Sequence, residues 1–508
     1  MKENKQLLKS SIGFVIILIA IASNILPREL GNLDELWIYN SAKNIVDGLL
    51  PYKDFNLVTT PFLPILASVF LKIIGNELIV MRGLAIILCT AIVCMIAIIM
   101  KKLKIKSNII YISLILIISL LKEHFCIDYN FFNLFLILCI IYLEILIWEE
   151  EGKIKKSIRG DFAIGILAGM TIGFKQTTGI VILIIAIANK VLIAIKKEEW
   201  KEIVKIVFIR MAGALVPIAL LAMYLSFNQL WSEFFNYTIF GVKEFTNLIP
   251  YTRLFKNSNL IIQILATILP IALCYMYFIT VARNDKTEND KKLFYIFCYS
   301  VASLIVIFPI SDEIHFLIGI IPCIIGVVYS VEKLIIWLET KITKEKIKIF
   351  ITEFVKCGLI IGVTLITLEN VRNFFDYSKQ IKQQQTFKHY SYIPISDGIY
   401  NRIETIHDYI KKQSNKVYIL DATAVVFKIP IDQYYKNYDL FLKGNLGKDG
   451  SNKLIEHIKT LNNEQILIQK SSRNWQTPED VVEYVEKNWN KVGEIDMFDI
   501  YEKKKEKK

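Results

Sequence analysis

Two adjacent carboxylates, Asp34 and Glu35, follow the first long apolar run of the chain, Ser11–Ile25. An acid at the boundary between water and lipid is partly desolvated, which raises its pKa and makes it usable as a general base. Acids also favour the first turn of an ordinary helix, because a helix N-terminus attracts negative charge. The pair therefore predicts either a site of proton abstraction or the start of a surface helix.

Aromatic side chains follow the acid pair in the same connection, at Trp37, Tyr39, Tyr52 and Phe55. Rings of this kind concentrate at the headgroup layer of a bilayer. We expect them to hold this connection against the membrane surface, with Tyr52 close to any substrate that the acid pair serves.

A second polar group, Glu123, His124 and Asp128, lies between two later apolar runs. Carboxylates and imidazole could bind a divalent cation, and with Glu35 they are the candidate ligands, although no defined ligand spacing links them. A solvated turn has the same composition. The sequence is compatible with both a divalent-cation site and a solvated turn.

A third group begins at Lys175 and Gln176, with two threonines behind them. A lysine with amide and hydroxyl neighbours at the end of a short apolar run suits an anionic group such as a lipid phosphate. The alternative is a lysine that extends its ammonium to the membrane surface.

The fourth group pairs Asp312 with His315, three residues apart at the start of another apolar run. At this spacing both side chains could share one face of a helix start. Helix capping by Ser311 or Asp312 explains half of the pattern without any function.

Long apolar runs must position these groups. The chain has 508 residues, of which 54% are hydrophobic. A bilayer-spanning helix needs about 20 apolar residues, and about eleven runs approach this length. The predicted spans are Ser11–Ile25, Leu78–Met100, Asn108–Leu121, Phe131–Ile147, Phe162–Phe174, Gly179–Ile195, Val207–Phe227, Leu260–Val281, Leu293–Phe308, Phe316–Ile336 and Phe350–Leu368. The prediction is a mostly α, polytopic membrane helical bundle, with Pro61–Ile74 as an outer interfacial helix.

Lysine and arginine predict the orientation of the bundle. Basic connections alternate with connections that are poor in basic residues, and the positive-inside rule puts the basic ones in the cytoplasm. The basic connections are Lys101–Lys106, Lys153–Arg159, Lys196–Lys205, Arg283–Lys292 and Lys333–Lys348. We therefore expect a plasma-membrane protein with a cytoplasmic N-terminus and an extracytoplasmic C-terminal part. All four polar groups then lie at the outer surface.

The net charge of +12 is explained by these connections and by the lysine-rich tail, so it predicts no nucleic-acid partner. The eight cysteines lie in or beside apolar runs and include no C-x-x-C pair, which indicates neither a disulfide scaffold nor a zinc site. The N-terminal run lacks a small-x-small cleavage pattern, and we expect it to be retained as the first span.

The composition becomes polar and mixed from Glu369 onward, which predicts a membrane domain over residues 1–368 and an outer α/β domain over residues 369–508. The expected helices are Gly398–Gln413, Ser451–Leu461 and Pro478–Asn488, and the expected strands are Lys416–Leu420, Gln465–Gln469 and Met497–Tyr501. Asp439–Gly450 is expected to be a loop and Glu502–Lys508 a disordered basic tail.

Several motifs, in this order, resemble those of the bacterial C-type (GT-C) membrane glycosyltransferases, which include protein O-mannosyltransferases and lipid A aminoarabinose transferases. The motifs are Asp34-Glu35, the Ala-x-x-Ile-x-x-Gly-x-x-Pro-Tyr-x-Asp-Phe run from Ala42 to Phe55, the helix after Pro61, Arg82, Gly-x-Lys-Gln at Gly173–Gln176 and Pro-x-x-x-Glu-x-His at Pro309–His315. The resemblance covers nearly the whole chain.

The resemblance implies transfer of a sugar from a polyprenyl-phosphate carrier to an acceptor on the outer face, with inversion at the anomeric carbon. Asp34 matches the general base; Glu35 and Asp128 match acids that assist, in some members through a divalent cation. Lys175 would stabilise the charge of the lipid phosphate, and His315 would line the same pocket. The acceptor, a cell-envelope glycan, lipid or protein, is not identified by any motif. Two parts depart from the family pattern, because no clear motif surrounds Asp128 and the C-terminal domain carries none assignable to catalysis.

Two other functions compete with this one. A transporter would carry charged residues deep within its spans, whereas Glu144 and Arg210 lie near predicted span ends. A surface-polysaccharide polymerase or ligase would be expected to carry arginines in a large late outer loop, where this chain has Arg253.

Overall fold

The apolar runs form long helices in the computed structural model, which describes residues 2–149, 154–196, 200–243, 248–256, 258–341, 345–383, 386–433, 443–471 and 478–504. Each predicted span coincides with one of these helices. They are α1 (Lys2–Ile25), α4 (Leu78–Lys102), α5 (Ser107–Leu121), α6 (Tyr129–Glu149), α7 (Ile154–Phe174), α8 (Gln176–Lys196), α9 (Trp200–Phe227), α12 (Leu260–Tyr277), α13 (Glu288–Ser303), α14 (Glu313–Lys341) and α15 (Glu345–Gln383). Short π-helical and 3-10 turns extend α12 over Phe278–Ala282 and α13 over Leu304–Ile307.

Within the described ranges, 6 helices are long and apolar enough to cross a membrane. They include α4, α6 and α14, and shorter apolar helices occur at Ser11–Ile25, Ser107–Leu121 and Gln176–Leu192. The predicted mostly helical, polytopic membrane bundle is confirmed.

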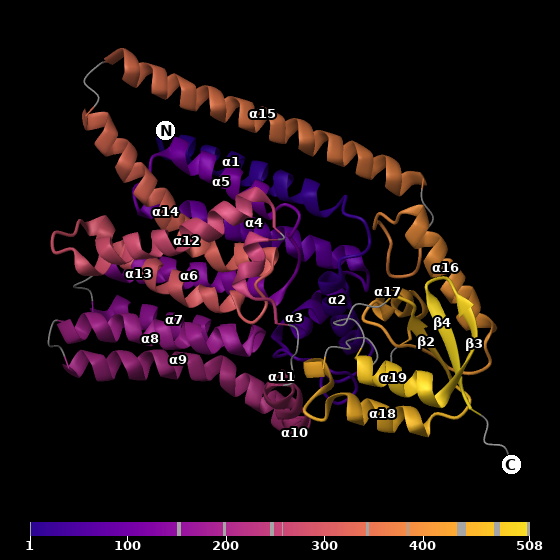
Figure 1. Ribbon diagram of the computed structural model, residues 1–508. Coiled ribbons are helices and arrows are strands. Elements are labelled where there is room, and N and C mark those ends of the chain that lie inside the picture. The colour runs from indigo at the N-terminus through magenta and orange to yellow at the C-terminus, as the bar shows by residue number, and fades with distance from the viewer. Residues whose placement is uncertain are drawn as a thin grey trace. The chain divides into compact units, whose positions relative to one another are not determined.

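The chain divides into two compact units (Figure 1). Unit 1 comprises Met1–Leu26, Leu84–Leu221 and Ile249–Asp376, and unit 2 comprises Pro27–Gly83, Ala222–Leu248 and Tyr377–Lys508. This division does not test where the membrane-embedded part ends, so the boundary between residues 368 and 369 stays a prediction.

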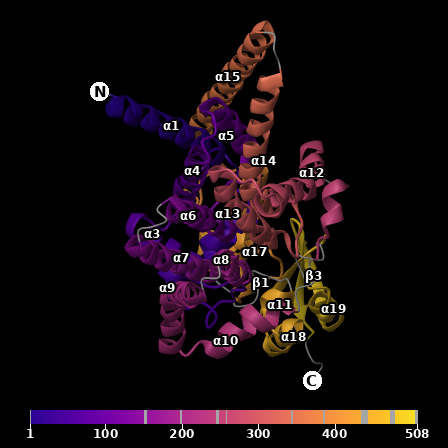
Figure 2. The same cartoon turned by 90° about the vertical axis from the view of Figure 1, so that its left-hand side faces the viewer.

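Unit 1 is a helical bundle in which α7 packs against both α6 and α8, and α13 packs against α6, α8 and α14 (Figures 1 and 2). Glycines allow α7 and α9 to approach closely. A Cβ at Gly165 would overlap the carbonyl oxygen of Arg210, and one at Gly213 would overlap that of Phe162. Small residues serve this purpose in membrane bundles because they let helix backbones touch.

Fully buried charges join α6, α7 and α9 inside unit 1. The Arg210 guanidinium contacts the Glu144 carboxylate at 2.7 Å and the Asp161 carboxylate at 2.6 Å. Asn189 of α8 and Tyr299 of α13 complete the network around Glu144. Helix α9 begins earlier than predicted, so Arg210 lies well inside the helix rather than near its end. Each charge has a partner, as a bundle interior requires.

Unit 2 begins with helices α2 (Leu33–Val46) and α3 (Phe62–Ile74), which pack against each other. Helix α3 coincides with the expected interfacial helix. Short helical segments follow much later in the chain: α10 (Trp231–Phe235), the π-helix Asn236–Phe240 and α11 (Gly241–Lys243) in unit 2, and the 3-10 turn Tyr251–Phe255 in unit 1.

The C-terminal part of unit 2 is the expected α/β fold. Its helices are α16 (Asp397–Lys412), α17 (Ala424–Lys428), α18 (Gly450–Thr460) and α19 (Glu479–Asn488), with 3-10 turns at Ile429–Ile431 and Lys443–Leu446. Its strands are β1 (Val417–Ile419), β2 (Gln465–Gln469), β3 (Trp489–Ile495) and β4 (Phe498–Lys503), in the order β1-β2-β4-β3. β1 and β2 are parallel, and the other two pairs are antiparallel.

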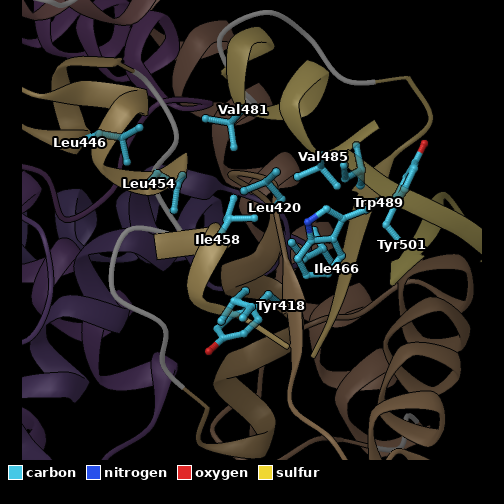
Figure 3. Close-up of a cluster of buried hydrophobic side chains, with 12 residues drawn as sticks. Tyr418, Leu420, Leu446, Leu454, Ile458, Ile466, Val481, Val485, Trp489 and Tyr501 are labelled. Atoms are coloured by element: carbon cyan, nitrogen blue, oxygen red, sulfur yellow. The ribbon is translucent and has the colours of Figure 1, made fainter. Parts of the chain in front are cut away.

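Buried apolar side chains hold this sheet to its helices. Leu420, Ile466 and Trp489 from the sheet side meet Ile458 of α18 and Val485 of α19 (Figure 3). Strand β3 was not predicted, because its central residues are mostly exposed on an edge strand and show no apolar alternation.

Some predictions fall partly outside the described residues: the connections Lys153–Arg159, Lys196–Lys205 and Lys333–Lys348, the loop Asp439–Gly450 and the tail Glu502–Lys508. β4 continues to Lys503, which is inside the segment expected to be a disordered tail.

Candidate functional site

The acid pair occupies the first turn of α2 in unit 2, and its two carboxylates have different environments. The Asn32 side chain caps the helix by accepting a hydrogen bond of 3.2 Å from the Glu35 backbone N–H. Asp34 is exposed, whereas Glu35 is 3% exposed. Neighbours in sequence point in different directions on a helix, so burial of one leaves the other accessible.

Glu35 forms a bidentate ion pair with Arg82, whose side chain is fully buried. Arg82 Nε and Nη2 lie 3.2 and 3.3 Å from the two Glu35 carboxylate oxygens. Arg82 Nη1 also donates to the Arg28 carbonyl at 2.6 Å. This arrangement fixes the start of α2, and Asp34 is the exposed member of the acid pair.

Tyr52 is completely buried in the connection after α2. Its hydroxyl donates to the Thr59 carbonyl at 2.8 Å, and its ring meets the Phe234 ring edge-on at 5.5 Å. Its φ of 71° is unusual for a residue with a side chain. Burial raises its pKa well above the ordinary value. The described contacts hold the loop together, and the predicted contact of Tyr52 with substrate stays a prediction.

Lys175 lies in unit 1, in the short turn between α7 and α8. Its ammonium donates to the Asn130 side chain at 3.0 Å and lies 4.9 Å from the centre of the Tyr129 ring. Gln176, the first residue of α8, is buried beside it. The contacts with an amide and an aromatic face place the Lys175 ammonium at the end of α7, where it adds a positive charge to the site.

Asp128 precedes α6 and is 4% exposed. Its carboxylate accepts a hydrogen bond of 2.6 Å from the Asn130 backbone N–H. Burial raises the pKa of Asp128 and outweighs the opposing effects of Lys175, the Asn130 N–H and His315. Asp128, Lys175 and His315 are thus close enough to interact electrostatically.

Asp312 and His315 form the helix-start pair that their spacing predicts, at the beginning of α14. The Asp312 carboxylate accepts from the His315 backbone N–H at 2.9 Å and contacts His315 Nδ1 at 2.7 Å. Burial alone would raise the pKa of Asp312, but the His315 hydrogen bonds and the nearby His124 lower it. Asp312 therefore both caps the start of α14 and contacts the His315 ring, and His124 lies near the same carboxylate.

Unit 1 consequently brings together five predicted residues from three connections: Asp128, Lys175, Asp312, His315 and His124. We call this set the Lys175 cluster. Asp34, Glu35 and Tyr52 belong to unit 2, and Glu123 is an exposed residue of unit 1.

The candidate metal ligands do not gather into a metal site. Among the described residues, no group of three or more His, Cys, Asp or Glu side chains could hold a metal ion. Glu35 is engaged by Arg82, and Asp128 faces Lys175. The residues present do not fit a divalent cation, and we derive no step through one.

Asn130 and Tyr129 contact Lys175 and were not predicted from the sequence. Asn133 and Thr178 were not predicted either; their side-chain polar atoms are buried and have no hydrogen-bond partner within the described ranges. Asn133 follows Asn130 by about one helical turn, and Thr178 follows Lys175 closely. Thr178 belongs to the polar stretch that begins at Lys175, and Asn130 follows Asp128 by two positions. The sequence therefore showed two polar residues at these positions but not the residues that they contact.

Solved structures with the GT-C fold match the chain along nearly its whole length. ArnT from Cupriavidus metallidurans in the apo state matches with a TM-score of 0.55 and 11% identity over 98% of both chains. The same protein bound to undecaprenyl phosphate matches with a TM-score of 0.57 and 10% identity, over 97% of this chain and 98% of that one. Archaeal oligosaccharyltransferase AglB from Archaeoglobus fulgidus, in complex with an inhibitory peptide and a dolichol-phosphate, matches with a TM-score of 0.51 and 9% identity, over 98% of this chain and 75% of that one.

These similarities confirm the expected fold. No protein-family profile matches the sequence, and no curated protein matches it significantly.

Proposed function

We propose that this protein is a membrane glycosyltransferase that transfers a sugar from a polyprenyl-phosphate carrier to an acceptor on the outer face of the membrane. The observation that carries the proposal is the Lys175 cluster, which brings a lysine ammonium together with polar side chains, where its positive charge would stabilise a phosphate. The fold supports it, since solved relatives in fold hold undecaprenyl phosphate and dolichol-phosphate.

The reaction is a single displacement. The acceptor hydroxyl oxygen attacks the anomeric carbon, and the bond between that carbon and the carrier phosphate oxygen breaks. Asp34 accepts the hydroxyl proton as general base, and the phosphate leaves with the bonding electrons. One displacement inverts the anomeric configuration.

The other predicted residues assist. Lys175 stabilises the charge that develops on the leaving phosphate, and Gln176 donates from the adjacent position. Asp128 orients Lys175, while Asp312 holds His315 in position for the donor. Glu35, through Arg82, keeps α2 and therefore Asp34 in place.

An apolar groove in unit 1 supports a lipid-linked donor. Helices α5, α12 and α14 line a cavity of about 480 Å³ with residues such as Leu116, Ile268 and Val327. Its lining extends to Leu120 of α5, close in sequence to His124 of the Lys175 cluster. A polyprenyl tail is apolar and would fill such a groove without leaving polar groups unpaired.

The topology is part of the proposal. The N-terminus lies in the cytoplasm, and the acid pair, the Lys175 cluster and the C-terminal domain face outward, as the Lys/Arg distribution predicts. The acceptor is a cell-envelope glycan, lipid or protein.

The test is transfer of a labelled hexose or pentose from polyprenyl phosphate by the purified full-length protein, scanned over several sugars and with extracted envelope material as acceptor. We expect label to appear in the acceptor with one of the sugars and in proportion to enzyme. Saturable transport of the sugar without covalent transfer would contradict the proposal.

A further inference from the structure

Trp37, near the start of α2, has an indole ring that no other ring of the described chain contacts. Its Nε1 donates a hydrogen bond of 3.2 Å to the Ala422 carbonyl, in the C-terminal part of unit 2. Tyr39 and Phe55, which the sequence groups with it, are buried, whereas Trp37 is only half-buried. Among the described residues, no aromatic ring or cation contacts its indole. The ring therefore has a fixed N–H edge and a partly exposed surface.

A hydrogen-bonded turn after β1 fixes the carbonyl that holds Trp37. The Asp421 carboxylate accepts from the Thr423 backbone N–H at 2.7 Å and from the Thr423 hydroxyl at 2.5 Å. The Ala424 N–H donates to the Asp421 carbonyl at 3.0 Å. Helix α17, which starts directly after this turn, packs against α2. The indole ring is thus preorganised, and a ligand that packs on it does not have to order it first.

Asp34 lies one helical turn before Trp37 on α2. Side chains three positions apart on a helix are neighbours, with Cβ atoms about 5–6 Å apart. Asp34 is exposed, and the Glu35–Arg82 ion pair fixes the turn that carries it. The indole ring therefore stands beside the carboxylate that the proposed mechanism uses as general base, close enough for one ligand to contact both.

The polar groups next to this ring accept hydrogen bonds. An ionised Asp34 carboxylate only accepts, and the half-buried Thr423 hydroxyl gives its proton to Asp421 and keeps its lone pairs. A pyranose supplies both complements, since its hydroxyl groups donate and the C–H groups of its ring pack on the electron-rich face of an indole. An acyl chain would put apolar groups against an exposed carboxylate, and a phosphate would be repelled by it.

We propose that Trp37 binds a sugar ring of the acceptor, so that the acceptor is a glycan at its reacting end. Packing on the indole would hold this sugar with one of its hydroxyl groups at Asp34. The motifs of the resemblance are Asp34-Glu35 and the run from Ala42, and position 37 lies between them without an assigned role. That the bound sugar is the acceptor rests on the proposed function, whereas the binding of a sugar at Trp37 does not.

The test is binding of free sugars to the purified full-length protein without any donor, measured by saturation-transfer NMR titration. The probes are cellobiose, maltose and N,N′-diacetylchitobiose, with a serine- and threonine-containing hexapeptide for comparison. We expect saturable binding of at least one disaccharide and none of the peptide. Trp37→Leu removes the aromatic ring and should weaken binding at least about tenfold, whereas Trp37→Phe keeps an aromatic face and should weaken it less than about threefold.

Trp231→Leu is the matched control, because Trp231 is an exposed tryptophan of unit 2 whose Nε1 also donates within the chain, to the Ser226 hydroxyl at 3.0 Å. It should bind as the wild type does. A Trp37 that only tied α2 to the Ala422 carbonyl would give Trp37→Phe and Trp37→Leu the same affinity, because both lack the N–H.

Equal affinities of these two Trp37 variants would overturn the inference. A wild type that binds no disaccharide, or that binds the peptide alone, would overturn it as well. Sugar binding without any sugar transfer would reject the proposed function and leave Trp37 as a sugar-binding residue. Transfer to a peptide or a lipid, with no disaccharide bound, would keep the proposed function and reject this inference.

Discussion

At the residue scale, neighbouring acids of the same type have different environments. Glu35 is buried against Arg82, while Asp34 is exposed one position earlier. Asp128 and Asp312 both belong to the Lys175 cluster, yet burial raises the pKa of Asp128, whereas the His315 contacts lower that of Asp312. The type of an acidic residue alone therefore does not determine its role. The burial and the partners of its carboxylate determine it.

Lys175→Gln should lower kcat/KM for the lipid-linked donor by about 10²-fold, because loss of one charge-stabilising donor has about this effect on catalysis. The measurement is initial-rate transfer at varied donor concentration. Lys122→Gln is the control, since Lys122 is a lysine of the same unit that forms a partly exposed ion pair with Glu369. Equal rates for Lys175→Gln and the wild type would exclude a role for Lys175 with the phosphate.

Asp128→Asn should change the pH dependence of stability. The pKa of Asp128 is raised above 3.8, so the folded state favours the neutral acid. Its ionisation destabilises the fold as pH rises from 3.8 through the folded-state pKa. The apparent melting temperature of the wild type relative to Asp128→Asn should therefore be higher at pH 4 than at pH 7.

Asp312→Asn should change the pH dependence of stability in the opposite direction. The pKa of Asp312 is lowered below 3.8, so its stabilising contribution is present above 3.8 and is lost as pH falls through the folded-state pKa. Melting in detergent over a pH series measures both variants. Parallel pH profiles for the two variants would show that their carboxylates do not differ as described.

The types of the site residues and the local Asp312–His315 pair were predictable from sequence, but the contacts between residues far apart in the chain were not. Asp128, Lys175 and His315 were visible as polar residues at the ends of apolar runs. The contact of Lys175 with Asn130 joins residues that are 45 positions apart, and no local pattern specifies such a contact.

At the scale of elements, α2 is the helix that presents Asp34, and the Glu35–Arg82 pair fixes its start. Glu35→Gln should destabilise the protein by about 3–5 kcal/mol, because it removes the carboxylate that faces the buried Arg82 guanidinium. The double variant Glu35→Met with Arg82→Met should lose less, since it removes the buried charge at both positions. Chemical unfolding in detergent compares them, and a double variant less stable than Glu35→Gln would contradict this account.

The elements themselves were largely predictable. A run such as Leu78–Met100 is apolar over a whole bilayer thickness, and such runs form helices because lipid offers the backbone no other hydrogen-bond partners. Strand β3 was missed because its exposed polar residues carry no periodic signal. The network around Arg210 was also missed, since it depends on the packing of several helices.

At the scale of the whole molecule, the alternation of basic and basic-poor connections predicts which loops face outward. The fold supports a multi-pass protein, whereas the orientation is a prediction from the charge distribution alone. In a variant with its native cysteines replaced, Asn452→Cys in the C-terminal domain should react with a membrane-impermeant maleimide on intact cells.

Lys286→Cys, in the basic connection before α13, should react with the same reagent only after the membrane is permeabilised. Together the two positions test the topology. Labelling of Lys286→Cys on intact cells, with protection of Asn452→Cys, would invert the predicted orientation and put the C-terminal domain in the cytoplasm.

In the proposed mechanism, Asp34 abstracts the acceptor proton during transfer from a polyprenyl-phosphate sugar. The most direct measurement is single-turnover transfer of labelled sugar by purified wild type and Asp34→Asn, with binding of the carrier measured alongside. We predict that Asp34→Asn binds the carrier as the wild type does, keeps its fold, and loses at least about 10³-fold in transfer rate. Full transfer activity in Asp34→Asn would contradict the mechanism.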